Sequence, residues 1–84
     1  MKHLREVLVT YLRKAGIEDA KVKTERVRDT KLHRVMVVSE RFKHLKFTER
    51  QDLIWRIASQ ALTPDEQLRI SMILTVTPEE LGGN

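Results

Sequence analysis

The chain has 84 residues, of which 40% are hydrophobic and 33% charged, and its formal net charge is +4 at pH 7. This length allows one domain with a modest core, and the composition is that of a globular protein rather than a disordered one. Because cysteine is absent, disulfides, thiolate metal sites and cysteine nucleophiles are excluded. We therefore expect a single domain over residues 1–84.

The apolar runs are short, and the first residues, MKHLREVLV, carry charges throughout. A membrane-spanning helix needs about 20 consecutive apolar residues, and a signal peptide needs an uninterrupted apolar stretch. We accordingly expect no membrane segment, no signal peptide and a cytoplasmic location.

The first predicted element is an amphipathic helix over residues 2–14. Its apolar side chains recur at helical spacing, at Leu4, Val7, Leu8, Tyr11 and Leu12. Gly16 should end this helix, because glycine adopts the left-handed backbone conformation at little cost.

Two strands are expected next, over residues 20–28 and 32–39, paired as a hairpin. Val22 is the clearest inward-facing residue of the first strand, and the second strand, LHRVMVVS, is rich in β-branched residues. The connection around RDTK contains no glycine, so its turn type stays unassigned.

A second helix is predicted to begin at the sequence TERQ. Thr48 and Gln51 have the spacing of a capping box, and the apolar stripe that follows continues to Leu62. Trp55 lies off the centre of this stripe and should be partly exposed. Thr63-Pro64-Asp65-Glu66 has a cap residue, proline and glutamate at the positions that favour a short helical turn.

The last strand is predicted over residues 68–76. Its buried face should carry the alternating apolar residues Leu68, Ile70, Met72, Leu74 and Val76. The segment 77–80 predicts a further turn, and residues 82–84 a frayed tail. The order α-β-β-α-α-β indicates an α+β fold, in which helices pack on one face of a three-stranded sheet.

The sequence contains no pattern typical of an enzyme. His3, His33 and His44 lie in three different elements without a helical i, i+4 partner, so no metal pair is evident, and His33 alone would make a poor metal site. The few glycines cannot form a phosphate-binding loop. We expect a non-enzymatic protein with no metal, no cofactor and no small-molecule substrate.

The positive charge is concentrated in residues 21–50, which hold ten Lys and Arg against four acidic residues. This pattern is typical of a surface that meets nucleic acid or an acidic protein, although solvation alone is an equally simple explanation. The candidate contact residues are Arg41, Lys43, His44, Lys46 and Arg50, with Lys21 and Lys23 in support.

Two aromatic residues, Phe42 and Phe47, are interleaved with these cations. Rings beside cations can stack on nucleic-acid bases. With only 5% aromatic residues, however, the domain needs its rings inside, so we predict that both are core residues.

These residues resemble the BolA family. The resemblance is carried by Val37-Val38-Ser39-Glu40-Arg41-Phe42, by Arg50 at the head of a helix, and by a last strand that runs into Thr77-Pro78-Glu79-Glu80. The resemblance implies the α-β-β-α-α-β fold, which is similar to a type II KH domain and suggests DNA binding. It also implies a role in stress or redox regulation, and a partnership with monothiol glutaredoxins in which the two proteins share an iron–sulfur cluster.

The chain departs from the family pattern at several positions. Arg69 stands where members have the histidine associated with cluster ligation, and arginine has no lone pair to donate. His44 replaces a loop glycine, and Arg50-Gln51 replaces Arg-His. We therefore expect no cluster ligation of the usual kind.

Two interpretations remain open. In the first, the chain binds DNA or RNA; because the sequence lacks the Gly-x-x-Gly loop of KH domains, binding would rest on phosphate contacts. In the second, the chain is an adaptor that docks a monothiol glutaredoxin or another acidic protein through the same surface.

Overall fold

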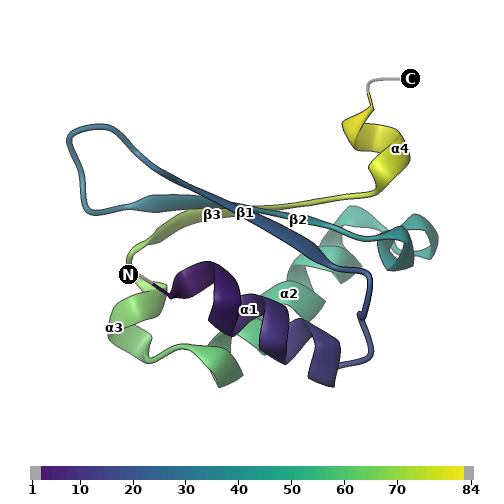
Figure 1. Cartoon of the computed structure of the whole chain (residues 1–84), viewed down its shortest axis with the longest axis horizontal. Coiled ribbons are helices and arrows are strands. Elements are labelled where there is room, and N and C mark those ends of the chain that lie inside the picture. The colour runs from purple at the N-terminus through teal and green to yellow at the C-terminus, as the bar shows by residue number, and fades with distance from the viewer. Residues whose placement is uncertain (1–2, 83–84) are drawn as a thin grey trace.

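A computed structural model describes residues 3–82 as two layers, a three-stranded sheet with helices on one face (Figure 1). The elements are α1 (Leu4–Lys14), β1 (Lys21–Arg26), β2 (His33–Val38), the 3₁₀ helix η1 (Glu40–His44), α2 (Phe47–Ala61), α3 (Pro64–Gln67), β3 (Ile70–Val76) and α4 (Pro78–Leu81). This is the predicted α+β fold and element order, with η1 and α4 as additional short helices. None of the helices in residues 3–82 has the length and apolar character that a membrane crossing requires.

Helix α1 ends at the predicted glycine. Gly16 has φ +92°, and its N–H donates to the Arg13 carbonyl at 3.0 Å, while the N–H of Ile17 donates to the Leu12 carbonyl at 2.9 Å. These two bonds form a Schellman motif, which satisfies the last carbonyls of the helix. The motif also turns the chain back so that Ile17 is buried. Lys2, the predicted first residue of this helix, lies outside the described residues.

Strands β1 and β2 form the predicted antiparallel hairpin, with Val22 buried. Both strands are shorter than predicted, because the chain between Arg26 and His33 forms its own hydrogen-bonded loop. The Thr30 hydroxyl donates to the Val27 carbonyl at 2.7 Å and accepts from the Leu32 N–H at 3.0 Å. Asp29 has φ 62° and takes the left-handed position that glycine usually fills.

Strand β3 pairs in parallel with β2, so the sheet order is β1-β2-β3. A register shift interrupts the pairing: His33 lies opposite Ile70, whereas Arg34 lies opposite Met72. Ser71 is therefore an extra residue in β3, a β-bulge. Its hydroxyl donates to the His33 carbonyl at 3.2 Å.

The bulge inverts the inward and outward faces of β3, and the predicted buried face is therefore wrong beyond Ile70. Met72 and Leu74 are 41% and 42% exposed, while Ile73 and Thr75 are buried. An extra residue shifts every following side chain to the other face of a strand. Leu68 precedes the strand and is 77% exposed.

The start of α2 also differs from the prediction. Lys46, not Thr48, occupies the N-cap position, and the helix begins at Phe47. The backbone N–H of Lys46 donates to the Glu49 carboxylate at 2.8 Å, which satisfies one donor at this helix end. The Gln51 side chain reaches across to the Ile73 carbonyl at 2.9 Å instead of capping the helix.

The two short helices that begin with proline are capped as their sequences suggest. In α3, the Thr63 N–H donates to the Glu66 carboxylate at 2.8 Å, and the Thr63 hydroxyl accepts from the Glu66 N–H at 3.1 Å. Thr77 and Glu80 form the same pair of bonds in α4. Such reciprocal capping fixes where each helix starts.

The core lies between the helices and the sheet. Its buried residues are Leu4, Leu8, Leu12, Ile17, Ala20, Val22, Val35, Val37, Phe42, Ile54, Ile57, Ala58, Leu62, Ile70 and Ile73. Phe42 is fully buried, as predicted, and Trp55 is partly buried, also as predicted. The prediction that Phe47 is a core residue is wrong, since this side chain is 65% exposed. Its position as the first residue of α2 leaves the ring outside the core.

The two phenylalanines should therefore differ sharply in their effect on stability. Phe42→Ala should lower the free energy of unfolding by about 3–5 kcal/mol, because it leaves a cavity in the core. Phe47→Ala should change it by no more than about 0.5 kcal/mol. Urea denaturation of both variants measures the difference, and equal losses would contradict the placement of the two rings.

Candidate functional site

The segment after β2 is a 3₁₀ helix held by a network of hydrogen bonds, not an irregular loop. Ser39 is buried; its hydroxyl accepts from the Arg41 N–H at 3.0 Å and donates to an Asp19 carboxylate oxygen at 2.7 Å. The other Asp19 oxygen accepts from the Glu40 N–H at 2.8 Å. These contacts cap η1 and tie it to the α1–β1 connection. They also lower the pKa of Asp19, chiefly through the Ser39 hydroxyl and then the Glu40 N–H.

Four of the predicted contact residues lie close together, on η1 and at the N-cap of α2. Phe42 anchors η1 in the core, so the cationic side chains around it are exposed. We call the following four residues the basic surface: Arg41, Lys43, His44 and Lys46. The exposed ring of Phe47 directly follows Lys46 at the start of α2.

Lys21 and Lys23 occupy a different face. Because Val22 between them points toward the helices, both lysines lie on the face of the sheet that α1 and α2 leave open. Lys21 pairs with Val38, the last residue of β2, and so lies at the end of the sheet where η1 begins. The two lysines therefore lie beside the basic surface, on the open face of the sheet, and are not part of it.

An open groove of about 540 Å³ borders the basic surface. Its lining residues are Ala15, Ile17, Glu40, Arg41, His44, Leu45 and Leu53. It lies between the C-terminal end of α1, η1 and α2. The groove combines the apolar residues Ile17, Leu45 and Leu53 with the polar residues Arg41, His44 and Glu40.

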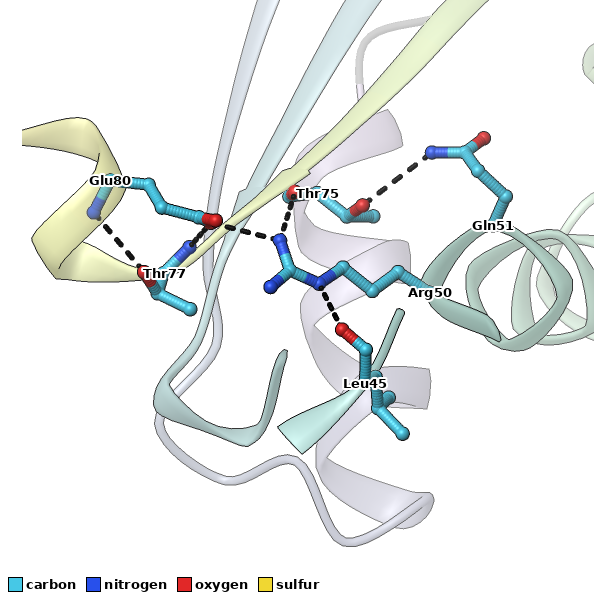
Figure 2. Close-up of polar contacts among 6 residues, drawn as sticks. All are labelled: Leu45, Arg50, Gln51, Thr75, Thr77 and Glu80. Carbon is cyan, nitrogen blue, oxygen red and sulfur yellow. Dashed lines mark hydrogen bonds and ion pairs between the residues drawn. The ribbon is translucent and has the colours of Figure 1, made fainter. Parts of the chain in front are cut away.

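Arg50 differs from the other predicted contact residues, because its side chain is only 12% exposed. Figure 2 shows how it is tied to its neighbours by polar contacts. Its Nε donates to the Leu45 carbonyl at 3.1 Å, and its Nη1 donates to the Thr75 carbonyl at 3.2 Å and to the Glu80 carboxylate at 2.8 Å. The guanidinium carbon also lies 5.9 Å from the centre of the Phe42 ring. We therefore assign Arg50 a positioning role: it joins α2 to the segment after η1, the end of β3 and α4.

Two further polar residues belong to this junction. Gln51 donates to the Ile73 carbonyl and lies 3.5 Å from the Thr75 hydroxyl. Glu80 accepts from both the Thr77 N–H and Arg50, and these hydrogen bonds, with Thr77 first, lower the pKa of its carboxyl group. The sequence predicted only a turn at Thr77 to Glu80, since nothing local shows that Arg50 is the partner of Glu80.

The histidines are not arranged as metal ligands. Within residues 3–82, no group of three or more His, Cys, Asp or Glu side chains is placed to hold a metal ion. His33 has a buried Nδ1 atom with no hydrogen-bond partner. Arg69 lies near Asp65, with 3.6 Å between Nη2 and a carboxylate oxygen.

Two solved structures of BolA proteins are similar to this chain. BolA1 from Arabidopsis thaliana superposes with a TM-score of 0.59 at 18% sequence identity, over 90% of this chain and 93% of that chain. A bol-like protein from Babesia bovis gives a TM-score of 0.56 at 18% identity, over 94% of this chain and 90% of that chain. The sequence matches no protein-family profile and no curated protein. The chain therefore has a BolA-like fold, as the resemblance of its residues predicted.

Replacing Arg50 tests its positioning role. Arg50→Lys cannot reproduce the planar fork of donors, so the carbonyls of Leu45 and Thr75 lose their partner. We expect the free energy of unfolding to fall by about 1–3 kcal/mol in chemical denaturation. Arg41→Lys, a matched change at an exposed arginine, should have almost no effect. Similar losses in the two variants would contradict the role assigned to Arg50.

The Asp19 contacts predict a pH-dependent contribution to stability. Because its pKa is lowered by folding, the carboxylate stabilises the folded state above its unfolded pKa, and this contribution is lost as the pH falls through the folded pKa. At neutral pH, Asp19→Asn should lower the free energy of unfolding by about 1 kcal/mol, and solvent exposure of the carboxylate keeps this loss small. The difference in free energy of unfolding between the variant and the unsubstituted protein should become smaller as the pH falls toward about 2.

Denaturation across this pH range measures the effect. Asp52→Asn, at an exposed carboxylate of α2, is the control for losing one negative charge. A cost for Asp19→Asn that stayed constant down to the lowest pH would rule out a contribution from the ionised carboxylate.

Proposed function

We propose that this chain is a non-enzymatic regulatory module that binds single-stranded nucleic acid through the basic surface and Phe47. The observation that carries the proposal is the exposed ring of Phe47 beside Lys46, in a domain with 5% aromatic residues. An exposed ring next to cations is the combination that single-strand binding uses: cations contact phosphates, and the ring stacks on a base.

The backbone that carries part of the basic surface is held by hydrogen bonds within the chain. Arg41, Lys43 and His44 extend from η1, whose backbone is fixed by Ser39 and Asp19. A rigid backbone reduces the entropy lost on binding.

The segment that carries the basic surface has more cations than acids. Residues 40–50 hold four Lys and Arg against the two acidic residues Glu40 and Glu49. This excess of positive charge favours an anionic partner.

Binding of this kind does not depend on sequence. The chain has no Gly-x-x-Gly loop to clamp the backbone, so phosphate contacts and stacking are the available interactions. Arg50 is not one of the proposed nucleic-acid contacts, because its side chain already donates hydrogen bonds to Leu45, Thr75 and Glu80.

The groove beside the basic surface favours a second candidate, an adaptor that docks an acidic protein such as a monothiol glutaredoxin. An apolar side chain of the partner would enter between Ile17, Leu45 and Leu53, while its acidic residues meet Arg41 and His44. Since Arg69 offers no lone pair, this adaptor would dock without supplying the usual cluster ligand.

A titration with fluorescent single-stranded RNA, single-stranded DNA and duplex DNA at several salt concentrations tests the proposal. We expect micromolar affinity for single strands and a log–log salt slope near −2, for about three phosphate contacts from Arg41, Lys43 and Lys46. Lys43→Glu with Lys46→Glu should remove binding at moderate salt without unfolding the protein. Phe47→Ala should weaken it about tenfold or more, with the salt slope unchanged, because stacking is lost while phosphate contacts remain.

The matched control reverses two exposed arginines on the helices, Arg5→Glu and Arg56→Glu, which changes the net charge by the same amount. If this control weakens binding as much as the Lys43 and Lys46 variant, the attraction is general and the proposed surface is wrong. If no strand binds even at low salt, while an acidic glutaredoxin forms a stoichiometric complex sensitive to Arg41→Glu, the adaptor function replaces nucleic-acid binding.

A further inference from the structure

A second group of cations lies at the other end of the sheet. Strand β1 runs from Lys21, near η1, to Arg26 at the hairpin loop, and this loop extends past the helical layer (Figure 1). A cleft of about 240 Å³ opens there. Its lining residues are Arg26, Lys31, His33 and Arg69.

The backbone holds three of these residues in one row. Arg26 and His33 are direct partners in the β1–β2 register, and the His33 N–H donates to the Arg69 carbonyl at 2.8 Å. By the alternation of each strand, Arg26 lies on the same side as buried Val22, and His33 on the same side as buried Val35. Both side chains therefore face the helix side of the sheet, beyond the end of the core.

Local contacts orient the donors but leave hydrogen-bonding capacity unused. The Nε of Arg26 donates to the Thr30 carbonyl at 3.0 Å; within residues 3–82, its two Nη atoms have no protein acceptor. The Nδ1 atom of His33 is buried and also has no partner. A buried polar atom without a partner costs free energy, and such atoms are uncommon in folded proteins.

The charge in the cleft is poorly balanced. Arg26, Lys31 and Arg69 are permanent cations, and no carboxylate lines the cleft. The nearby Asp65 lies 3.6 Å from Arg69, but its side chain is 80% exposed. A metal ion would be repelled here, whereas an anion would neutralise the cations.

We propose that this cleft binds a phosphate group, either as the free ion or as the monoester of a small molecule. A tetrahedral phosphate presents oxygens in several directions, which suits donors that converge from four segments of the chain, and guanidinium groups pair with it in a two-pronged manner. The cleft volume leaves room for part of an organic group beside the phosphate. The site shares no residue with the basic surface, so this proposal does not depend on nucleic-acid binding.

The test follows the ring signals of His33 by NMR during titration with inorganic phosphate and, separately, with adenosine monophosphate, at constant pH and ionic strength. We expect a saturable shift of His33 below about 20 mM ligand, while the signals of His3, which lies in neither proposed site, stay nearly constant. Saturation with phosphate alone identifies the free ion as sufficient. Saturation only with the nucleotide identifies an ester as the ligand. No saturable shift of His33 with either ligand overturns the proposal.

Single substitutions separate a built site from general attraction. Arg69→Gln and Lys31→Gln should each weaken binding about tenfold, since each removes a charged donor to the phosphate. The control is Arg34→Gln: Arg34 adjoins His33 in β2 but lies on the opposite face, 3.7 Å from the Glu25 carboxylate. It should change the affinity by less than about twofold. Equal weakening by Arg34→Gln and Arg69→Gln would show general attraction and overturn the proposal.

Discussion

Arg50 places a cation at the point where four parts of the fold meet, with only 12% of its side chain exposed. A charge removed from water must be matched by acceptors, or it destabilises the folded state. Here the acceptors are the Leu45 and Thr75 carbonyls and the Glu80 carboxylate, which come from distant positions in the chain. The start of α2, the end of β3 and α4 are thereby held in one arrangement, and the segment that carries the basic surface is held with them (Figure 2).

The positive charge of residues 21–50 is divided between two ends of the sheet. The basic surface lies where β2 ends, whereas Arg26, Lys31 and His33 gather at the hairpin loop with Arg69. The length of β1 separates the two ends by roughly 17–20 Å. A small ligand cannot bridge this distance, so a phosphate bound in the cleft would not contact the basic surface. The net charge of +4 does not show this division.

Features that depend on neighbouring residues could be predicted from the sequence. Gly16 ends α1 because a left-handed residue is needed at that point, and the threonine-proline-acid sequences at Thr63 and Thr77 cap their helices locally. The BolA-like fold was predictable for the same reason: its elements follow one another with clear local signals.

Features that depend on distant partners could not be predicted. The alternation in residues 68–76 is real, but the unpaired Ser71 arises only when β3 is matched to β2, and it inverts the face that Met72 and Leu74 present. The sequence likewise shows the charge of Arg50 without its partner Glu80. The cleft at the hairpin loop cannot be predicted from the sequence, because Arg26, Lys31, His33 and Arg69 come from separate segments and no spacing links them.

The parallel pairing of β2 with β3 has a consequence for the order of folding. The β1–β2 hairpin closes a short loop, whereas β3 can join the sheet only after the whole segment between Val38 and Ile70 has been brought back. Contacts of high sequence separation are entropically slow to form. We therefore expect β3 to dock late in the transition, which makes the junction at Arg50 and the contribution of Arg69 among the last parts of the native state to appear. A nascent or partly unfolded chain would present the lysines of β1 without either completed site.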